Sequence, residues 1–400
     1  MVASGTALIA TTYGLVRLAY GLLLPEAQAE LGLGDTSAGL VAAGASVLYC
    51  LGALTGFVTA DRHPRALVLA AGVSAALGCV AMALAPGSAV FAAGAVLSSA
   101  GAGLASPALV VLVDRSAPSA RIDGARAIDP AARDRAQTAV NAGTGPGLVI
   151  AGTLALLLLP HWRAAWGVAA AAAVLTTTLV LSATIRPGER PDDRSAPDGP
   201  VTAAWLRAHG APVVAALTLG TGSAAVWSYG RSLLVATGDA GSASAVAWIA
   251  LGLGGVAVLP TSGWLVRRRL GTAWALTAGA VAAATLALPV SAATLPFAVL
   301  LCGIAGWGYT AATGVLIGWT TRIDSRRAAA GTAALFVALV LGQALGAALT
   351  GALLPLVGPL GAFAVSGLIG AVGLVVARDP GVRSQLPHRT YGANPDQVDG

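Results

Sequence analysis

The sequence predicts an all-α membrane protein with twelve transmembrane helices in two pseudo-symmetric six-helix halves. Of its 400 residues, 56% are hydrophobic and only 10% are charged, whereas soluble domains carry about 25% charged residues. Twelve apolar stretches follow one another along the chain, each near the roughly 20 residues that a helix needs to cross a bilayer. Arginine-rich segments separate many of these stretches, and a polar linker divides them into two groups of six.

The apolar stretches and the linker define the expected domains. The stretches lie near residues 5–25, 37–60, 66–85, 89–112, 137–159, 164–184, 210–234, 243–266, 272–291, 295–319, 329–352 and 357–377. The linker is rich in proline and charge, so it cannot bury an apolar core. We assign an N-terminal half (1–185), a cytoplasmic linker (186–203), a C-terminal half (204–378) and a polar cytoplasmic tail (379–400).

All 23 basic residues are arginines, and their positions predict the orientation. Arg17 and Arg231 lie within predicted spans and Arg163 in a loop on the opposite side, so 20 (23 − 3) lie on the side of the linker and termini. Cytoplasmic loops carry the excess of positive charge in membrane proteins. Because lysine is absent and alanine, glycine and arginine abound, as in high-GC bacteria, we expect a multi-pass protein of a bacterial cytoplasmic membrane with both termini in the cytoplasm.

Several function classes are disfavoured by composition. The net charge of +6 does not predict nucleic-acid binding, because the arginines are dispersed and no aromatic-rich polar module accompanies them. Cys50, Cys79 and Cys302 lie in apolar stretches without the spacing of a disulfide framework or metal site. The spans lack the paired Asp, Ser/His or metal constellation of a membrane enzyme. We therefore expect no enzyme, no cofactor and no metal, and a monomer in the lipid bilayer.

Three features recur in the same order in the two halves. The matched pairs are Tyr20-Gly21 with Tyr229-Gly230, Asp61-Arg62 with Arg267-Arg268, and Gly143, Gly145 and Gly147 with Gly342 and Gly346. Internal repeats in membrane proteins usually build transporters whose site lies between the halves. The loop 115–135 breaks the symmetry, and we expect a solvated insertion there, with a short surface helix as the alternative.

With these motifs, the chain resembles the major facilitator superfamily over nearly its whole length. The family signature after span 2 reads Gly, three residues, Asp, Arg, any residue, Gly and then basic residues. Here Asp61, Arg62 and Arg65 match it, whereas Phe57 and Pro64 replace the two glycines. The counterpart after span 8 has Gly263 and Arg267-Arg268, and Gly145-Pro146-Gly147 in span 5 is similar to the motif of the family's antiporters. Span 1 resembles a bacterial branch of poorly characterised permeases.

The resemblance implies a transporter that works by alternating access, with these motifs as its gates. In the family, the Asp after span 2 pairs across to the other half and closes the cytoplasmic side, a role that falls on Asp61; the alternative is a solvated charge. Pro146 removes a backbone donor and can kink its helix. The glycines permit close packing of helices, and this packing would serve either gating or structure alone. The gating candidates are Asp61, Arg62, Arg65, Asp114, Gly145, Pro146, Gly147, Gly263, Arg267 and Arg268.

Arg17 is the strongest indication of the substrate. It lies in the middle of span 1, where a charge is costly and normally faces a cavity with a partner. Tyr13, Arg17 and Tyr20 have the spacing of one helix face. No Asp or Glu lies inside the twelve predicted stretches, so we expect Arg17 to meet carbonyls, hydroxyls and water, or an anionic substrate. The alternative is a structural hydrogen-bond hub.

Arg231 and several aromatic or polar residues complete the candidate site. In the alignment of the two halves Arg231 matches Leu22, so we expect it nearer the outer face than Arg17. An arginine from each half would suit an anion, as in the superfamily's organophosphate exchangers. The alternative is that the Arg231 side chain extends to the outer membrane interface. Aromatic walls suit amphipathic or planar substrates. The candidate substrate-binding residues are Arg17, Tyr13, Tyr20, Tyr49, Asn141, Trp227, Arg231, Trp307, Tyr309 and Gln343.

The predicted function is transport of a small molecule, with an organic anion as the first choice. Because proton-coupled transporters usually titrate a buried carboxylate, exchange of anions or facilitated movement fits the chain better than proton coupling. The alternative is a proton-coupled exporter of drugs or metabolites that uses Asp61, Asp114 or Glu26. A non-transporting receptor or scaffold is a remote third hypothesis.

Overall fold

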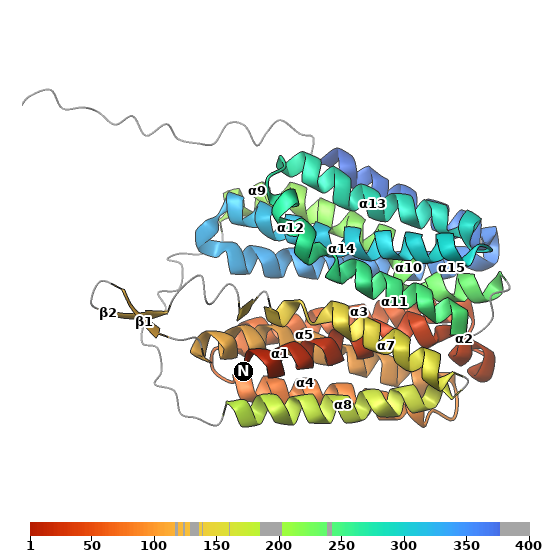
Figure 1. The fold of residues 1–400 in the computed structure, drawn as a ribbon, viewed down its shortest axis with the longest axis horizontal. Coiled ribbons are helices and arrows are strands. Elements are labelled where there is room, and N and C mark those ends of the chain that lie inside the picture. The colour runs from red at the N-terminus through yellow and green to blue at the C-terminus, as the bar shows by residue number, and fades with distance from the viewer. Residues whose placement is uncertain are drawn as a thin grey trace, which may run out of the picture.

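The structure, a computed structural model, describes residues 1–116, 119–122, 125–128, 136–137, 139–159, 161–184, 202–237 and 242–376. The expected linker therefore lies outside the described residues except for 202 and 203, and the tail 379–400 lies outside them altogether. Most of the described residues form long helices that run roughly parallel to one axis (Figure 1).

The N-terminal half begins with a composite first span. This span comprises the helix α1 (Val2–Ile9), the π-helix η1 (Ala10–Arg17) and the helix α2 (Ala19–Leu31). The other helices of this half are α3 (Asp35–Thr59), α4 (Pro64–Ala83), α5 (Ser88–Ser116), α7 (Thr144–Leu158) and α8 (Trp162–Ala183).

The C-terminal half begins with a short helix and continues with long ones. Its elements are α9 (Ala203–Ala208), α10 (Gly210–Ala236), α11 (Ser242–Val256), α12 (Val258–Val266), α13 (Leu270–Ser291), α14 (Leu295–Ile323), the 3₁₀-helix η2 (Ser325–Arg327) and α15 (Ala328–Val376).

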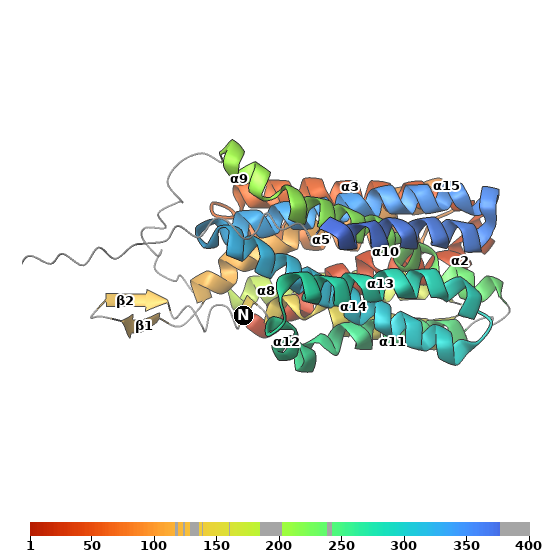
Figure 2. The same cartoon turned by 90° about the horizontal axis from the view of Figure 1, so that it is seen from above.

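The predicted fold class, a helical membrane-spanning bundle, is confirmed. Among the described residues, ten helices are long and apolar enough to cross a membrane, or eleven if the bent pair of α11 and α12 counts as one span. The 49 residues of α15 would extend about 73 Å, more than twice the bilayer core. Gly358, with φ 68°, breaks this helix, and its two arms run antiparallel (Figure 2). The count of twelve crossings stays a prediction.

The two halves lie side by side, with the N-terminal half in red to yellow and the C-terminal half in green to blue (Figure 1). They meet along α3 with α15, α7 with α11, and α2 with α10. Two of the repeated glycines pack against helices of their own half. A Cβ on Gly147 would lie 2.2 Å from the Ala10 carbonyl oxygen, and one on Gly346 would lie 2.3 Å from that of Thr221.

The segment after α5 differs from the surface helix that we considered for the loop 115–135. Its described residues form the strands β1 (Ser119–Ile122) and β2 (Ala125–Ile128), which pair antiparallel with Ser119 opposite Ile128. The pair projects past the helix ends at the left of Figure 1. We call this the terminal end of the bundle, because Met1 and the start of α9 also lie there, and the opposite end the distal end.

Candidate functional site

The π-helix η1 holds Arg17 at the centre of the bundle. The backbone N–H of Leu18 donates to the carbonyl of Tyr13 at 2.9 Å, five residues earlier, which is the π-helical spacing and a frequent mark of functional sites. Gly14 allows this segment to approach α7, since a Cβ on Gly14 would lie 2.5 Å from the Cα of Gly147. Glycine at both positions therefore fixes the path of the segment that carries Arg17.

Arg17 connects the two halves through neutral groups. Its Nη2 donates to Oε1 of Gln343 in α15 at 2.9 Å, and Nε2 of Gln343 donates to the Tyr309 hydroxyl in α14 at 2.9 Å. The guanidinium carbon lies 4.7 Å from the ring centroid of Tyr49, whose hydroxyl is 2.7 Å from that of Tyr13. Four residues that the sequence placed with Arg17, namely Tyr13, Tyr49, Tyr309 and Gln343, do form one cluster.

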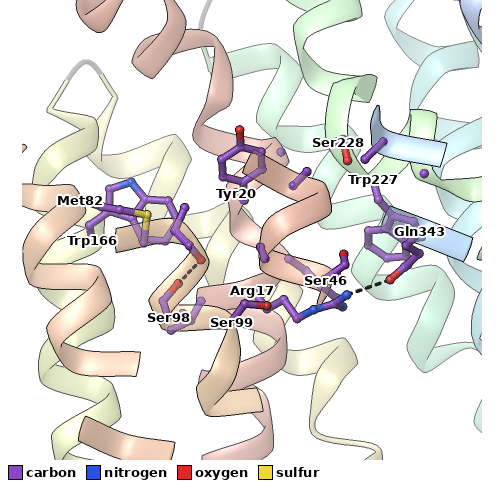
Figure 3. Close-up of a pocket in the computed structure, with 18 residues that line it drawn as sticks. Arg17, Tyr20, Ser46, Met82, Ser98, Ser99, Trp166, Trp227, Ser228 and Gln343 are labelled. Carbon is purple, nitrogen blue, oxygen red and sulfur yellow. Dashed lines mark hydrogen bonds between the residues drawn. The ribbon is translucent and has the colours of Figure 1, made fainter. Parts of the chain in front are cut away.

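A small cavity of about 50 Å³ lies between the halves beside this cluster (Figure 3). Arg17 crosses the view to reach Gln343, and Trp227 and Ser228 of α10 lie on the C-terminal side. Tyr20 also lines the cavity, and its hydroxyl donates to the carbonyl of Ala38 at 2.9 Å. Among the described residues that line it, Arg17 alone is charged, so the cavity presents one positive charge.

Arg231 occupies a different place and has a different partner. It is fully buried, and its Nη1 and Nη2 donate to the Glu26 carboxylate of the other half at 2.5 and 2.6 Å. Its Nε donates to Ser244 Oγ at 2.9 Å, and Nη1 also donates to the carbonyl of Leu22. Arg231 neither snorkels nor joins Arg17 at the cavity, and both expectations were wrong. They failed because the first span extends past residue 25, which brings Glu26 inside it.

Other hydrogen bonds also join the halves at the distal end. The Tyr229 hydroxyl donates to the carbonyl of Asp35 at 2.8 Å, and the Thr36 hydroxyl donates to that of Gly351 at 3.2 Å. The Ser232 hydroxyl donates to Gln28 Oε1 at 3.3 Å. Together with the pair of Glu26 and Arg231, these contacts close the distal end.

The charged gating candidates lie toward the terminal end, and three of them take part in hydrogen bonds within the N-terminal half. Arg115 Nη2 donates to the Asp61 carbonyl at 2.6 Å, and Arg65 Nη1 donates to that of Thr184 at 3.5 Å. The buried Asp114 accepts from Gln137 at 3.3 Å. In the C-terminal half, Gly263, Arg267 and Arg268 are exposed, as Arg62 is in the other half.

Pro146 does not kink the middle of its helix, and the candidate cavity residues Asn141 and Trp307 lie away from the cavity. Pro146 is exposed in the first turn of α7, which begins at Thr144. In the first turn the missing N–H breaks no hydrogen bond of the helix, so proline does not kink it there. Gly145 faces Val256 of the other half, where a Cβ would lie 2.9 Å from its side chain. Asn141 is exposed, and Trp307 Nε1 donates to Thr261 at 2.9 Å, so neither lines the cavity.

Sequence reasoning missed the serines and the tryptophan on the cavity wall. These residues are Ser46, Ser98, Ser99, Trp166 and Ser228. Ser46 precedes Tyr49 by three residues on α3, a spacing that puts both on one helix face and so gave a usable signal. Ser98 and Ser99 lie in a stretch of small residues, where no periodic pattern distinguishes them.

Comparisons with known proteins agree with this architecture. The described fold is similar to a bacterial homolog of the human lysosomal transporter Spinster in inward-facing conformation, with TM-score 0.64, 17% identity and 94% of each chain covered. It is also similar to a peptide transporter POT (TM-score 0.70, 16% identity, 94% of this chain and 91% of that chain) and to the nucleoside transporter NupG (TM-score 0.74, 12% identity, 94% and 98%). A search of curated protein sequences finds no match.

The family profile covers most of the chain. Residues 6–317 match the profile of the Major Facilitator Superfamily, a segment that includes the N-terminal half from residue 6 onward and ends within α14. The fold and the cavity between the halves are consistent with this match. The chain belongs to the Major Facilitator Superfamily.

Proposed function

We propose that this protein is a secondary transporter that moves a small organic anion across the membrane by alternating access, and that Arg17 binds the anion. The observation that carries the proposal is the pairing of Arg17. It contacts the amide oxygen of Gln343 and the ring of Tyr49 at a cavity between the halves, and neither group is charged.

The energetics of a partly exposed cation inside the bundle favour an anionic ligand. A charge inside a membrane protein is costly unless it is paired or reaches water, and neutral acceptors offset that cost only in part. A guanidinium can donate two parallel hydrogen bonds to a carboxylate or phosphate group. An anion in the cavity would therefore gain more from Arg17 than a neutral or cationic molecule of the same size.

Alternating access accounts for the different contacts at the two ends. The distal end is closed by hydrogen bonds between the halves, and at the terminal end Arg65 and Arg115 donate to carbonyls of their own half. Since the expected topology puts 20 of the 23 arginines in segments on the side of the termini, the positive-inside rule supports a cytoplasmic terminal end. The transporter would then be closed toward the outside, and the segments around Asp61 and Arg267 would close the cytoplasmic side in the other conformation.

Proton-coupled export is the second candidate, and Glu26 favours it. This carboxylate joins the halves through Arg231 at the distal end. Protonation of Glu26 would remove the negative charge that holds Arg231 and would favour opening of that end. A coupling proton would thus act at Glu26, apart from the cavity that Arg17 lines.

The first experiment is a thermal-shift screen of purified wild type and Arg17→Ala. The ligands are organic acids, phosphorylated metabolites, sugars and lipophilic cations, and a ligand that binds the folded state raises the unfolding midpoint. We expect stabilisation by anions in wild type, no such effect in Arg17→Ala, and an unchanged effect in the control Arg207→Ala, which alters an exposed arginine of α9. Stabilisation by cations or neutral compounds in both wild type and Arg17→Ala would contradict an anion site.

Flux measurements separate the two candidates and test transport itself. Protein in liposomes should exchange a labelled anion for the same unlabelled anion without a pH gradient, and Glu26→Gln should retain some of this exchange. Accumulation that requires a pH gradient, and that is lost in Glu26→Gln protein that still binds the ligand, would favour the proton-coupled exporter. Ligand binding without any flux would favour a receptor over either transporter.

A further inference from the structure

Two adjacent serines on the wall of the cavity differ in their hydrogen bonds. The hydroxyl of Ser98 donates to the carbonyl of Ala95 at 2.9 Å, as serines in membrane helices commonly do (Figure 3). The hydroxyl of Ser99 is buried and has no hydrogen-bond partner among the described residues. An unpaired buried hydroxyl costs free energy that a partner would recover. Ser99 lines the cavity, so a change of its rotamer would let the contents of the cavity supply that partner.

Hydroxyls from two other helices line the same cavity. Ser46 of α3 and Ser228 of α10 are both buried, and no hydrogen bond of either hydroxyl to another described residue is recorded. The wall thus combines one guanidinium with three hydroxyls that are not used by the backbone. This set suits a ligand that has an uncharged oxygen in addition to its anionic group.

The volume of the cavity limits the size of that ligand. About 50 Å³ is open, and one water occupies roughly 10–15 Å³ by the same measure. In this conformation the cavity therefore holds about three to five waters, or an anion with a similar number of non-hydrogen atoms. This is far below the roughly 300–1,000 Å³ of pockets that enclose drug-sized molecules.

We propose that the substrate class is small hydroxy- or keto-monocarboxylates, in which the carboxylate binds Arg17 and the second oxygen binds the hydroxyls of Ser46, Ser99 and Ser228. This inference rests on the anion site proposed above. The single positive charge of the cavity matches a monocarboxylate, and a dicarboxylate would bring a second charge without a partner. The serines select for the added oxygen, because a methyl group in its place leaves their hydroxyls unpaired.

Acetate and glycolate form the matched pair of probes, since they differ by one hydroxyl. Thermal shifts of purified protein are measured at equal ionic strength, with sodium chloride as the reference and citrate as a large anion. We expect glycolate to bind about tenfold more tightly than acetate in wild type, and citrate to give no shift beyond that of chloride. Both small anions should lose their effect in Arg17→Ala.

The variants Ser46→Ala and Ser99→Ala, alone and combined, test the role of the hydroxyls. We expect the combined variant to bind acetate as wild type does and to lose most of the preference for glycolate, because only the Ser228 hydroxyl remains to contact the second oxygen. Ser98→Ala is the control, because this serine lines the same cavity but its hydroxyl is bonded to Ala95, and it should keep the tenfold preference.

The outcomes separate this inference from the anion site itself. Equal binding of acetate and glycolate, with both lost in Arg17→Ala, would overturn the hydroxyl contacts and leave Arg17 as an anion site. Equal loss of the glycolate preference in Ser98→Ala and Ser99→Ala would also overturn them. Binding of citrate but of neither small anion would overturn the size limit, and the absence of any anion that depends on Arg17 would overturn both proposals.

Discussion

Arg17 and Arg231 both lie inside the bundle, but they differ in their partners. Arg231 is fully buried and donates two hydrogen bonds to the carboxylate of Glu26, one to Ser244 and one to Leu22. Arg17 donates to one neutral amide and lies over an aromatic ring beside a cavity. The chain itself neutralises the charge of Arg231 and leaves that of Arg17 without a counter-ion among the described residues.

This difference separates a structural charge from a charge that is available to a ligand. Both arginines contact residues of the opposite half, so their place between the halves does not distinguish them. A guanidinium with a bidentate carboxylate has few hydrogen bonds left to offer. We infer that Arg231 stabilises the closed distal end, whereas Arg17 keeps donors free for an anion.

The largest expected effect is the loss of Arg231. Arg231→Met leaves the largely buried carboxylate of Glu26 unpaired, and breaking a buried ion pair on one side costs about 3–5 kcal/mol. We therefore expect a large fall in the free energy of unfolding, measured by denaturant titration in detergent micelles. Adding Glu26→Gln to Arg231→Met should restore part of the loss, because it removes the unpaired charge. Additive losses in the double variant would contradict direct coupling between the two residues.

A smaller effect is expected from the glycine that holds η1 against α7. Gly14→Ala puts a Cβ within 2.5 Å of the Cα of Gly147, and overpacking of this kind costs about 1–3 kcal/mol. We expect this loss in the same titration, together with weaker anion binding, because Arg17 is displaced with the helix. Gly318→Ala in α14 is the control, since nothing lies within 4 Å of its Cβ position. Equal stability of the two variants would argue against tight packing at Gly14.

The sequence predicted the fold and much of the Arg17 cluster for identifiable physical reasons. Apolar length and the distribution of arginine indicate membrane helices, and the helical spacing of Tyr13 and Arg17 indicates a shared surface. Gln343 was found because a polar side chain within an apolar stretch needs a partner. These signals depend on residues that lie close together in the sequence, so one sequence is enough to detect them.

The contacts that were missed depend on where helices end and how they cross. Glu26 was placed outside the first span because hydropathy falls at Pro25, yet the helix continues to Leu31. The π-helix has no signature in this sequence, since it depends on the close approach of Gly14 to Gly147. The difference between Ser98 and Ser99 arises from rotamers and neighbours in α5, which residue types alone do not encode.

The comparison predicts that Arg17 contributes little to stability. Arg17→Met loses the hydrogen bond to Gln343 and the contact with Tyr49, but it also removes a half-buried charge that has no acidic partner among the described cavity residues. Replacing such a charge by an apolar side chain is often close to neutral, so we expect a loss of at most about 1 kcal/mol with anion binding abolished. A loss as large as that of Arg231→Met would make Arg17 a structural hub instead.

The smallest effect is expected at the ion pair of Glu30 and Arg163 on the distal surface. Its nitrogen and oxygen are 2.9 Å apart, and the side chains of Arg163 and Glu30 are 30% and 50% exposed. Exposed pairs contribute little because water and salt screen them. Glu30→Gln also keeps an oxygen that can accept from Trp162 Nε1, which now donates to Glu30 at 2.6 Å. We therefore expect the unfolding midpoint of Glu30→Gln to match that of wild type within error. A shift comparable to that of Arg231→Met would show that the exposed pair of Glu30 and Arg163 stabilises the protein as much as the buried pair of Glu26 and Arg231. Burial would then not explain the difference in role between Arg17 and Arg231.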